Sequence, residues 1–148
     1  MLGPMTTTRA TTTTSPDAAT VGAVGRFLDA VRGGTGVAAD LLAPGAVLDA
    51  TVPGWRFSVR GAQAVARQYS GWFDHPASFE ELERRRTDDG EVLTYLLGWV
   101  EGGVPHAAHH CHVLSLDADG RIAADRFFCG GRWDAALLAE MAAADDAG

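Results

Sequence analysis

Apolar residues recur at helical spacing in three stretches of the first half of the chain. Residues 18–32 show the three- and four-residue spacing of a helix that buries one face, and two glycines end it. Residues 37–42 form a shorter pattern that stops before Pro44, and residues 61–73 form the third. We therefore predict three N-terminal helices.

The rest of the apolar pattern is typical of strands. An extended segment at residues 46–53 carries Asp49, and an irregular piece then leads into the third helix. Strand-like runs follow at residues 78–87 and 91–101. The longest such stretch, residues 104–133, has two apolar runs around a turn-forming Asp-Ala-Asp-Gly sequence, which predicts a β-hairpin.

The hairpin determines which side chains share one face of the sheet. If the four turn residues form the loop, Leu116 faces Arg121, and counting back places His112 opposite Asp125. The predicted face then carries His110, His112, Leu114, Asp125, Phe127 and Cys129. The turn before this hairpin adds Tyr95, Leu97 and Trp99 to the same face.

Helices followed by such a sheet define an α+β domain in which the helices cover one sheet face. We expect a cone: three N-terminal helices packed on a strongly curved, mostly antiparallel sheet that encloses a pocket. The domain is predicted at residues 19–134, after a disordered threonine-rich segment at 1–18 and before a short alanine-rich tail at 135–148.

Composition narrows the class of partner. All twelve basic residues are arginines and the net charge is −7, which argues against a nucleic-acid or anionic membrane surface. No apolar run approaches the roughly 20 residues that cross a bilayer. We expect a cytoplasmic protein with reduced cysteines, no cofactor, and a homodimer formed through the outer sheet face.

Three pieces of the chain resemble a known superfamily. L-L-A-P-G-A-V-L-D-A-T-V-P-G, R-G-A-Q-A-V-A-R-Q-Y and D-A-D-G-R-I-A-A-D-R-F-F, in this order of elements, resemble the NTF2-like superfamily and its SnoaL-like and ketosteroid-isomerase-like proteins. The similarity covers roughly residues 20–133. It implies the cone-shaped cystatin-like fold, which hosts isomerases, dehydratases, cyclases and non-catalytic binders.

The resemblance to ketosteroid isomerase also implies positions for a site. The isomerase's hydrogen-bond-donating acid falls on His112, and its supporting tyrosine falls on Tyr69. Its first-helix tyrosine falls on Phe27, which has no hydroxyl. Its general base falls on Ala50, next to Asp49. The resemblance therefore favours a pocket with different chemistry over steroid isomerisation.

The residues themselves suggest acid/base catalysis. Asp125 can fix the tautomer of His112 and raise its basicity, which suits proton abstraction beside a carbonyl or loss of water. Tyr69 is a candidate hydrogen-bond donor and Asp49 a candidate second acid/base group. A buried hydrogen-bonded pair without chemistry is the alternative for His112 and Asp125.

We predict an enzyme that isomerises, dehydrates or cyclises a small hydrophobic carbonyl compound. A non-catalytic ligand-binding or dimerisation module is the rival hypothesis. His110, His112 and Asp125 also have the residue types of a metal site, which we rank below the metal-free reading. The predicted substrate-binding residues are Phe27, Trp55, Trp72, Tyr95, Trp99, His110, Phe127 and Cys129.

Overall fold

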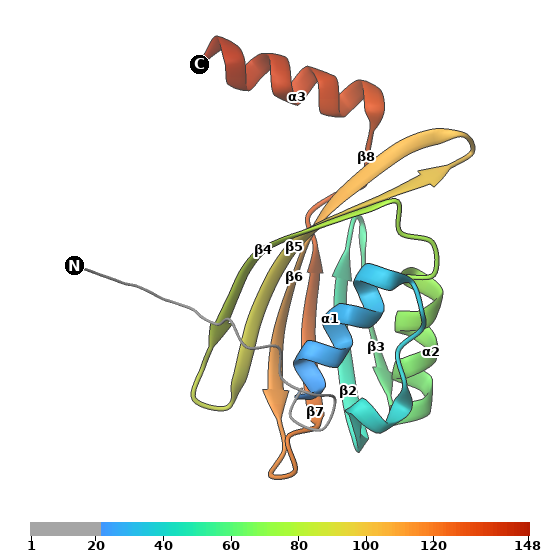
Figure 1. Ribbon diagram of the computed structural model, residues 1–148, viewed down its shortest axis with the longest axis vertical. Helices are drawn as coiled ribbons and strands as arrows, with labels where there is room; N and C mark the ends of the chain where they lie inside the picture. Colours follow the sequence, from blue (N-terminus) through green and yellow to red (C-terminus); the bar gives the residue numbers. More distant parts are fainter. Residues whose placement is uncertain (1–21) are drawn as a thin grey trace, which may run out of the picture.

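The computed structural model describes residues 22–148. The threonine-rich segment 1–18, for which we expect disorder, lies outside the described residues. In the described part, α1 (Ala23–Gly33) and α2 (Ala62–Trp72) form a layer on one face of a single sheet (Figure 1). The arrangement is therefore α+β, as the order of apolar patterns predicts.

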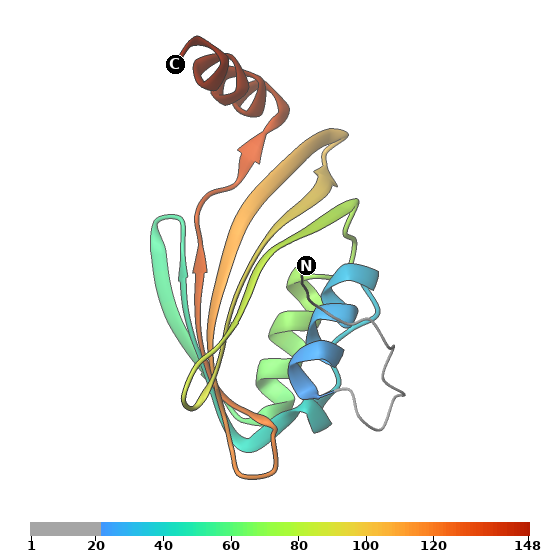
Figure 2. The ribbon, with the colours of Figure 1, turned by 60° about the vertical axis from the view of Figure 1, so that its left-hand side comes forward.

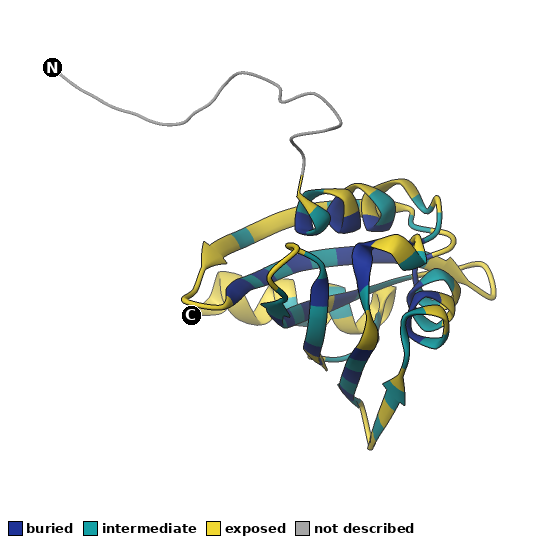
Figure 3. Ribbon diagram, turned by 90° about the horizontal axis from the view of Figure 1, so that it is seen from below, coloured by how far each residue is buried: buried dark blue, intermediate teal, exposed yellow. Residues whose placement is uncertain are grey.

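Both helices are amphipathic and turn their apolar sides to the sheet. The buried positions of α1 are Val24, Phe27, Leu28 and Val31, and those of α2 are Val65, Ala66 and Tyr69. Figure 2 shows the two helices next to each other against the sheet, and Figure 3 shows their buried positions facing inward. Helical spacing thus determined the buried faces correctly.

Two elements between these helices differ from the prediction. The predicted helix at 37–42 is one 3-10 turn, η2 (Ala39–Leu41), and Leu42 already begins strand β2 (Leu42–Val52). A residue before proline avoids helical backbone, so Pro44 keeps Ala43 extended. The predicted irregular piece is strand β3 (Trp55–Arg60), because Pro53 and Gly54, with φ 76° at the glycine, form a tight turn that pairs Val52 with Trp55.

The remaining strands follow α2. They are β4 (Ser78–Arg86), β5 (Gly90–Glu101), β6 (Val104–Leu116), β7 (Ile122–Cys129) and the short β8 (Trp133–Asp134). The order across the sheet is β3-β2-β7-β6-β5-β4, and β8 pairs with β6. The sheet is mixed: β2 and β7 are parallel, and the other neighbours are antiparallel. The parallel pair joins the β2–β3 hairpin to β7, and α2 packs mainly on β2 and β3.

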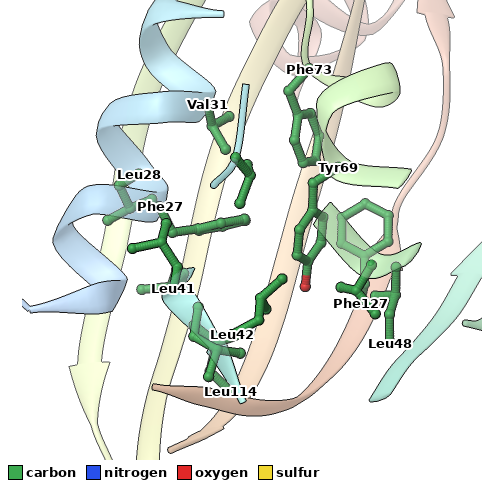
Figure 4. Close-up of a cluster of buried hydrophobic side chains, with 14 of the residues drawn as sticks. Phe27, Leu28, Val31, Leu41, Leu42, Leu48, Tyr69, Phe73, Leu114 and Phe127 are labelled. Atoms are coloured by element: carbon green, nitrogen blue, oxygen red, sulfur yellow. The ribbon is translucent and has the colours of Figure 1, made fainter. Parts of the chain in front are cut away.

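The core lies between the helices and the middle of the sheet. Figure 4 shows Phe27 from α1 and Tyr69 from α2 meeting above the strands that carry Leu48, Leu114 and Phe127. The rings of Phe27 and Tyr69 pack edge to face with centroids 5.0 Å apart. Burial of these apolar side chains fixes the helices over the sheet positions that carry the polar residues described below.

The alanine-rich C-terminal segment is helical. It forms α3 (Ala135–Ala147), with the Asp134 carboxylate accepting from the backbone N–H of Leu137 at 2.9 Å as an N-cap. None of its residues is buried, and Figure 1 shows it beyond β8, away from α1 and α2. Across residues 22–148, no helix combines the length and apolar character needed to span a membrane.

One glycine position tests the register of the sheet. A Cβ on Gly90 would lie 1.8 Å from the Leu114 carbonyl oxygen of the neighbouring strand. We expect Gly90→Ala to lower the free energy of unfolding by about 3 kcal/mol, because β5 and β6 must separate there. Urea unfolding would measure this loss.

Gly45→Ala is the matched control for that substitution. Gly45 has no atom within 4 Å of an added Cβ and no positive φ, so its change should stay within about 0.5 kcal/mol. Equal losses for the two variants would contradict the observed pairing of β5 with β6.

Candidate functional site

The sheet face under the helices carries the six side chains that the sequence assigned to it. His110, His112, Leu114, Asp125 and Phe127 are buried, and Cys129 is half-buried. The opposite face carries His109, which is exposed. The shared face predicted for these six side chains is therefore observed.

The predicted partners across the hairpin are wrong by two residues. His112 lies opposite Phe127, His110 opposite Cys129, and Asp125 opposite Leu114. The loop has one residue more than predicted, since Leu116 pairs with Ile122, and a register shift beside Ser115 adds another. Each one-residue displacement turns the side chains to the other face, so two displacements return them to the predicted face. The predicted face is therefore correct although the predicted pairs are not.

Asp125 is nevertheless in direct contact with His112. Its Oδ2 lies 2.7 Å from Nδ1 of His112, diagonally across the two strands. The same oxygen accepts a hydrogen bond of 2.6 Å from the Tyr69 hydroxyl of α2. Asp125 thus joins a helix to two strands through one buried oxygen.

The hydrogen-bonded chain continues on the other side of His112. Its Nε2 lies 2.8 Å from the Tyr95 hydroxyl on β5, and this hydroxyl lies 3.3 Å from Nδ1 of His110. Tyr69, Asp125, His112, Tyr95 and His110 therefore form one continuous network, which we call the buried network.

A carboxylate at one end gives this network a direction. A carboxylate can only accept, so Nδ1 of His112 carries the hydrogen and its Nε2 accepts from the Tyr95 hydroxyl. The oxygen of Tyr95 then accepts from Nδ1–H of His110, which leaves a lone pair on Nε2 of His110. The hydrogen positions are assigned from these partners.

His112 is sealed from solvent. Its side chain has no exposed surface, and its ring packs against Phe27 and Phe127 with centroids 5.1 and 4.8 Å away. Both ring nitrogens already have partners. Direct proton transfer between His112 and a substrate, as the sequence suggested, is therefore incompatible with this structure.

A cavity of about 560 Å³ lies next to the buried network, between the end of α2, the β2–β3 turn and the far parts of β5 and β7. Its walls are largely apolar, and the apolar side chains are Val52, Pro53, Phe57, Trp72, Phe73, Leu97, Trp99 and Phe127. Its polar side chains are Asp74, Glu101, His110, Cys129 and Arg132. His110 is the one member of the buried network that lines this cavity.

The cavity contains five of the predicted substrate-binding residues: Trp72, Trp99, His110, Phe127 and Cys129. Three others lie elsewhere. Phe27 and Tyr95 are fully buried in the core, and Trp55 is 70% exposed at the start of β3. Phe27 covers His112, Tyr95 belongs to the buried network, and Trp55 follows the tight turn, so none of the three reaches the cavity wall.

Asp49 is also outside the site. Leu48 and Ala50, its neighbours on β2, are buried under the helices, so alternation turns Asp49 to the opposite face. There it accepts a hydrogen bond of 2.6 Å from Arg56. The pairing of β2 with β7 is regular from Val47 to Thr51, so no bulge rotates Asp49 inward. The prediction of a second acid/base group at Asp49 is wrong.

Sequence reasoning missed several lining residues near the open end. Phe73 and Asp74 follow the last turn of α2, and Arg132 follows the glycines after β7. Arg132 contacts the Glu101 carboxylate and lies over the Trp99 ring, 5.5 Å from its centroid. No motif marks these residues, because loop geometry alone brings them to the cavity.

Burial decides the protonation states. The pKa of His110 is lowered to about 3, first by burial and then by the neighbouring His112 and His109, so the imidazole is neutral at physiological pH. The pKa values of Tyr69 and Tyr95 are raised well above their ordinary value, chiefly by burial and then by Asp125, so both hydroxyls keep their protons.

Neither an activated cysteine nor a metal site is found among the described residues around the cavity. Burial raises the pKa of the Cys129 thiol, which donates to the Gly131 carbonyl oxygen at 3.4 Å and is not an activated thiolate. Within the described residues, no group of three His, Cys, Asp or Glu side chains has the geometry of a metal site. Asp125 contacts His112 directly and Tyr95 bridges His112 to His110, so the three groups form a chain and do not converge on one point.

Comparison with solved structures places this architecture. An NTF2-like protein of unknown function from Burkholderia xenovorans has a TM-score of 0.58 and 16% identity, covering 74% of this chain and 80% of its own. A proposed isomerase from Rhodopseudomonas palustris has a TM-score of 0.61 and 12% identity, covering 76% and 92%. A protein from Kribbella flavida has a TM-score of 0.54 and 23% identity, covering 85% and 95%.

These similarities define the fold. The mixed sheet with helices on one face is the NTF2-like fold, as the resemblance of the sequence implied. The chain matches no protein-family model and no curated protein. Identities of this size carry the architecture and not the reaction.

The lowered pKa of His110 predicts a pH dependence of stability. Between about pH 6 and pH 4 the unfolded chain binds a proton at this residue that the folded protein excludes, so acidification favours unfolding. Replacing His110 by Gln removes this difference in proton binding. As the pH falls, the free energy of unfolding of the variant should therefore decrease less steeply than that of the wild type, and the two slopes should differ by about 1 kcal/mol per pH unit.

Chemical denaturation of both proteins across this pH range would measure the difference. His109→Gln changes the adjacent, exposed histidine, the last of the three causes of the lowered His110 pKa, and should change the slope much less than His110→Gln does. Identical slopes for the wild type and His110→Gln would show that His110 protonates normally in the folded protein.

Proposed function

We propose that this protein is an enzyme that performs cofactor-independent acid/base chemistry, such as isomerisation, dehydration or cyclisation, on a small hydrophobic carbonyl compound. The cavity beside the buried network is the substrate pocket of the cone that the resemblance implies. The observation that carries the proposal is a neutral imidazole, His110, in the wall of an aromatic-lined cavity.

His110 is the group that meets the substrate. Its Nδ1 is held by Tyr95, and within the described residues its Nε2 has no hydrogen-bond partner. A fixed imidazole with a free lone pair is suited to take a proton from the carbon beside a carbonyl, or to return one to a leaving hydroxyl. This assignment replaces His112 by its neighbour two residues earlier on the same face.

In this proposal His112 and Asp125 do not touch the substrate but position His110 through hydrogen bonds. Asp125 fixes the tautomer of His112, and Tyr69 holds Asp125 through its hydroxyl. The chain thus orients the substrate-facing imidazole from a rigid core, as preorganised acid/base sites require.

The walls define the class of substrate. Trp72 packs on Phe127 with ring centroids 5.0 Å apart, and Phe57 lies 5.9 Å from Trp72, so flat apolar surfaces face the cavity. The charged groups Asp74, Glu101 and Arg132 are all in the lining, and Glu101 and Arg132 are paired. A neutral, flat carbonyl compound fits this combination.

A non-catalytic binding module is the second candidate. It is favoured by the burial of His112 and Asp125, which are 0% and 1% exposed, because such a network can serve stability alone. The two candidates agree on the cavity and differ on whether His110 exchanges protons with its occupant.

Proton exchange into flat bicyclic and tricyclic ketones separates the candidates. We expect the protein to catalyse deuterium incorporation beside the carbonyl in heavy water, followed by NMR, and His110→Gln to lower the rate by about 10²–10⁴-fold. His109→Gln should retain the wild-type rate. Ketone binding with no exchange above background would favour the binding module instead.

We also propose a homodimer through the outer sheet face. Phe128 is 42% exposed there, opposite Cys111, and Val113 is half-buried beside it. Light scattering after size exclusion should give twice the chain mass, and Phe128→Lys should shift the protein to the monomer by placing charge in the interface. A monomeric wild type at micromolar concentration would refute the dimer.

A further inference from the structure

The substrate-facing histidine is poorly placed to keep a proton. His110 is 7% exposed, and the rings of Tyr95, Phe73 and Phe127 pack against it. Its titratable neighbours are Tyr95, His112, His109 and, directly opposite on β7, Cys129, and none of them is a carboxylate. A cation at this position would be buried without a counter-ion, which is costly. The carboxylate that can balance such a charge, Asp125, contacts His112 instead.

The buried network connects these two places. From Nδ1 of His110 to Oδ2 of Asp125, each neighbouring pair of polar atoms is within 3.3 Å, through Tyr95 and His112. We propose that the part of the buried network from His110 through Tyr95 to His112 is a proton relay, in which a proton accepted by His110 is stored as a cation on His112 beside Asp125. The relay rests on the proposed function for its direction towards a substrate, but not for its existence.

The relay moves one proton equivalent and breaks no bond between heavy atoms. Nε2 of His110 gains a proton from the substrate carbon, whose electron pair passes into the enolate. Nδ1 of His110 then gives its hydrogen to the Tyr95 oxygen, and the Tyr95 hydroxyl gives its own to Nε2 of His112. His110 ends neutral with the opposite tautomer, Tyr95 ends unchanged, and His112 becomes an imidazolium paired with the Asp125 carboxylate.

The reverse sequence returns the proton. Nε2–H of His112 reprotonates Tyr95, which reprotonates Nδ1 of His110, and Nε2–H of His110 is released to a second carbon or to a leaving hydroxyl. An isomerisation or a dehydration needs both halves, and the relay supplies them without any cofactor.

The surroundings of His112 support storage at that ring. The titratable groups that face it are Asp125 from β7, Tyr95 from β5, Tyr69 from α2 and His110 from its own strand. Phe27 from α1 and Phe127 close the remaining sides. Asp125 is the one negative group among these neighbours, and it is in direct contact.

The weakest link is the 3.3 Å separation between His110 and Tyr95. Hydrogen bonds of catalytic groups are often long without substrate and shorten in the reacting complex. Tyr95 is therefore the positioning residue whose removal should break the relay while leaving His110 in the cavity wall.

Nitrogen-15 NMR of the histidines tests the relay without any ligand. At neutral pH we expect both His110 and His112 as the neutral tautomer protonated at Nδ1. On acidification His112 should become doubly protonated, and His110 should change to the Nε2-protonated tautomer at the same midpoint while remaining neutral.

Two tyrosine variants locate the path. In Tyr95→Phe the tautomer of His110 should no longer follow the protonation of His112. In Tyr69→Phe, which also removes a buried hydroxyl but lies outside the path, the coupled change should persist. If Tyr95→Phe does not fold, the wild-type titration and Tyr69→Phe still decide.

The outcomes that overturn the relay are specific. They are a doubly protonated His110, a His110 tautomer that stays fixed while His112 takes up its proton, or no proton uptake by His112 before unfolding. A coupled change together with ketone binding but no exchange above background would leave the relay standing and refute the proposed enzyme. Exchange activity without the coupled change would do the opposite.

Discussion

One oxygen atom, Oδ2 of Asp125, connects the helix and strands that carry the buried network. It accepts from Tyr69 on α2 at 2.6 Å and from His112 on β6 at 2.7 Å, in a core position that is 1% exposed. An isolated carboxylate in such a position costs several kcal/mol, and hydrogen bonds to the charged form offset that cost. The contact therefore requires α2, β6 and β7 to take the relative positions they have.

This constraint extends to the cavity. With Asp125 as acceptor, the direction of each hydrogen bond follows, through His112 and Tyr95, to a lone pair on His110. The apolar core around the network, with Phe27 on one side of His112 and Phe127 on the other, removes competing water. The neutral imidazole of His110 in the cavity wall and the carboxylate of Asp125 in the core are thus connected by one chain of hydrogen bonds. The NTF2-like fold supplies the cavity, and these residues supply the reason to expect chemistry in it.

The alternation of strands explains what the sequence could predict. Side-chain faces have a period of two, so the hairpin assigned His110, His112, Asp125 and Phe127 to one face even though its pairs were displaced by two residues. The same regularity turned Asp49 away from the site, because β2 has no bulge between Val47 and Thr51.

The alternation of faces could not predict which residues of this face are buried in the core and which line the cavity. His110 and His112 share a face and chemistry, but only the first lines the cavity, because α1 brings Phe27 over the second. Arg132 and Asp74 reach the cavity from loops, whose paths depend on the packing of distant elements. A pattern of residue types thus predicted the polar network in outline, and tertiary packing decided which member lines the cavity.

The proton on Nδ1 of His112 tests the central contact most directly. In a one-dimensional proton NMR spectrum it should give a strongly deshielded signal that exchanges slowly with water, because a carboxylate binds it in a sealed core. The signal should disappear in Asp125→Ala and persist in His109→Gln. A fast-exchanging signal, or a His112 protonated at Nε2 alone at neutral pH, would contradict the account.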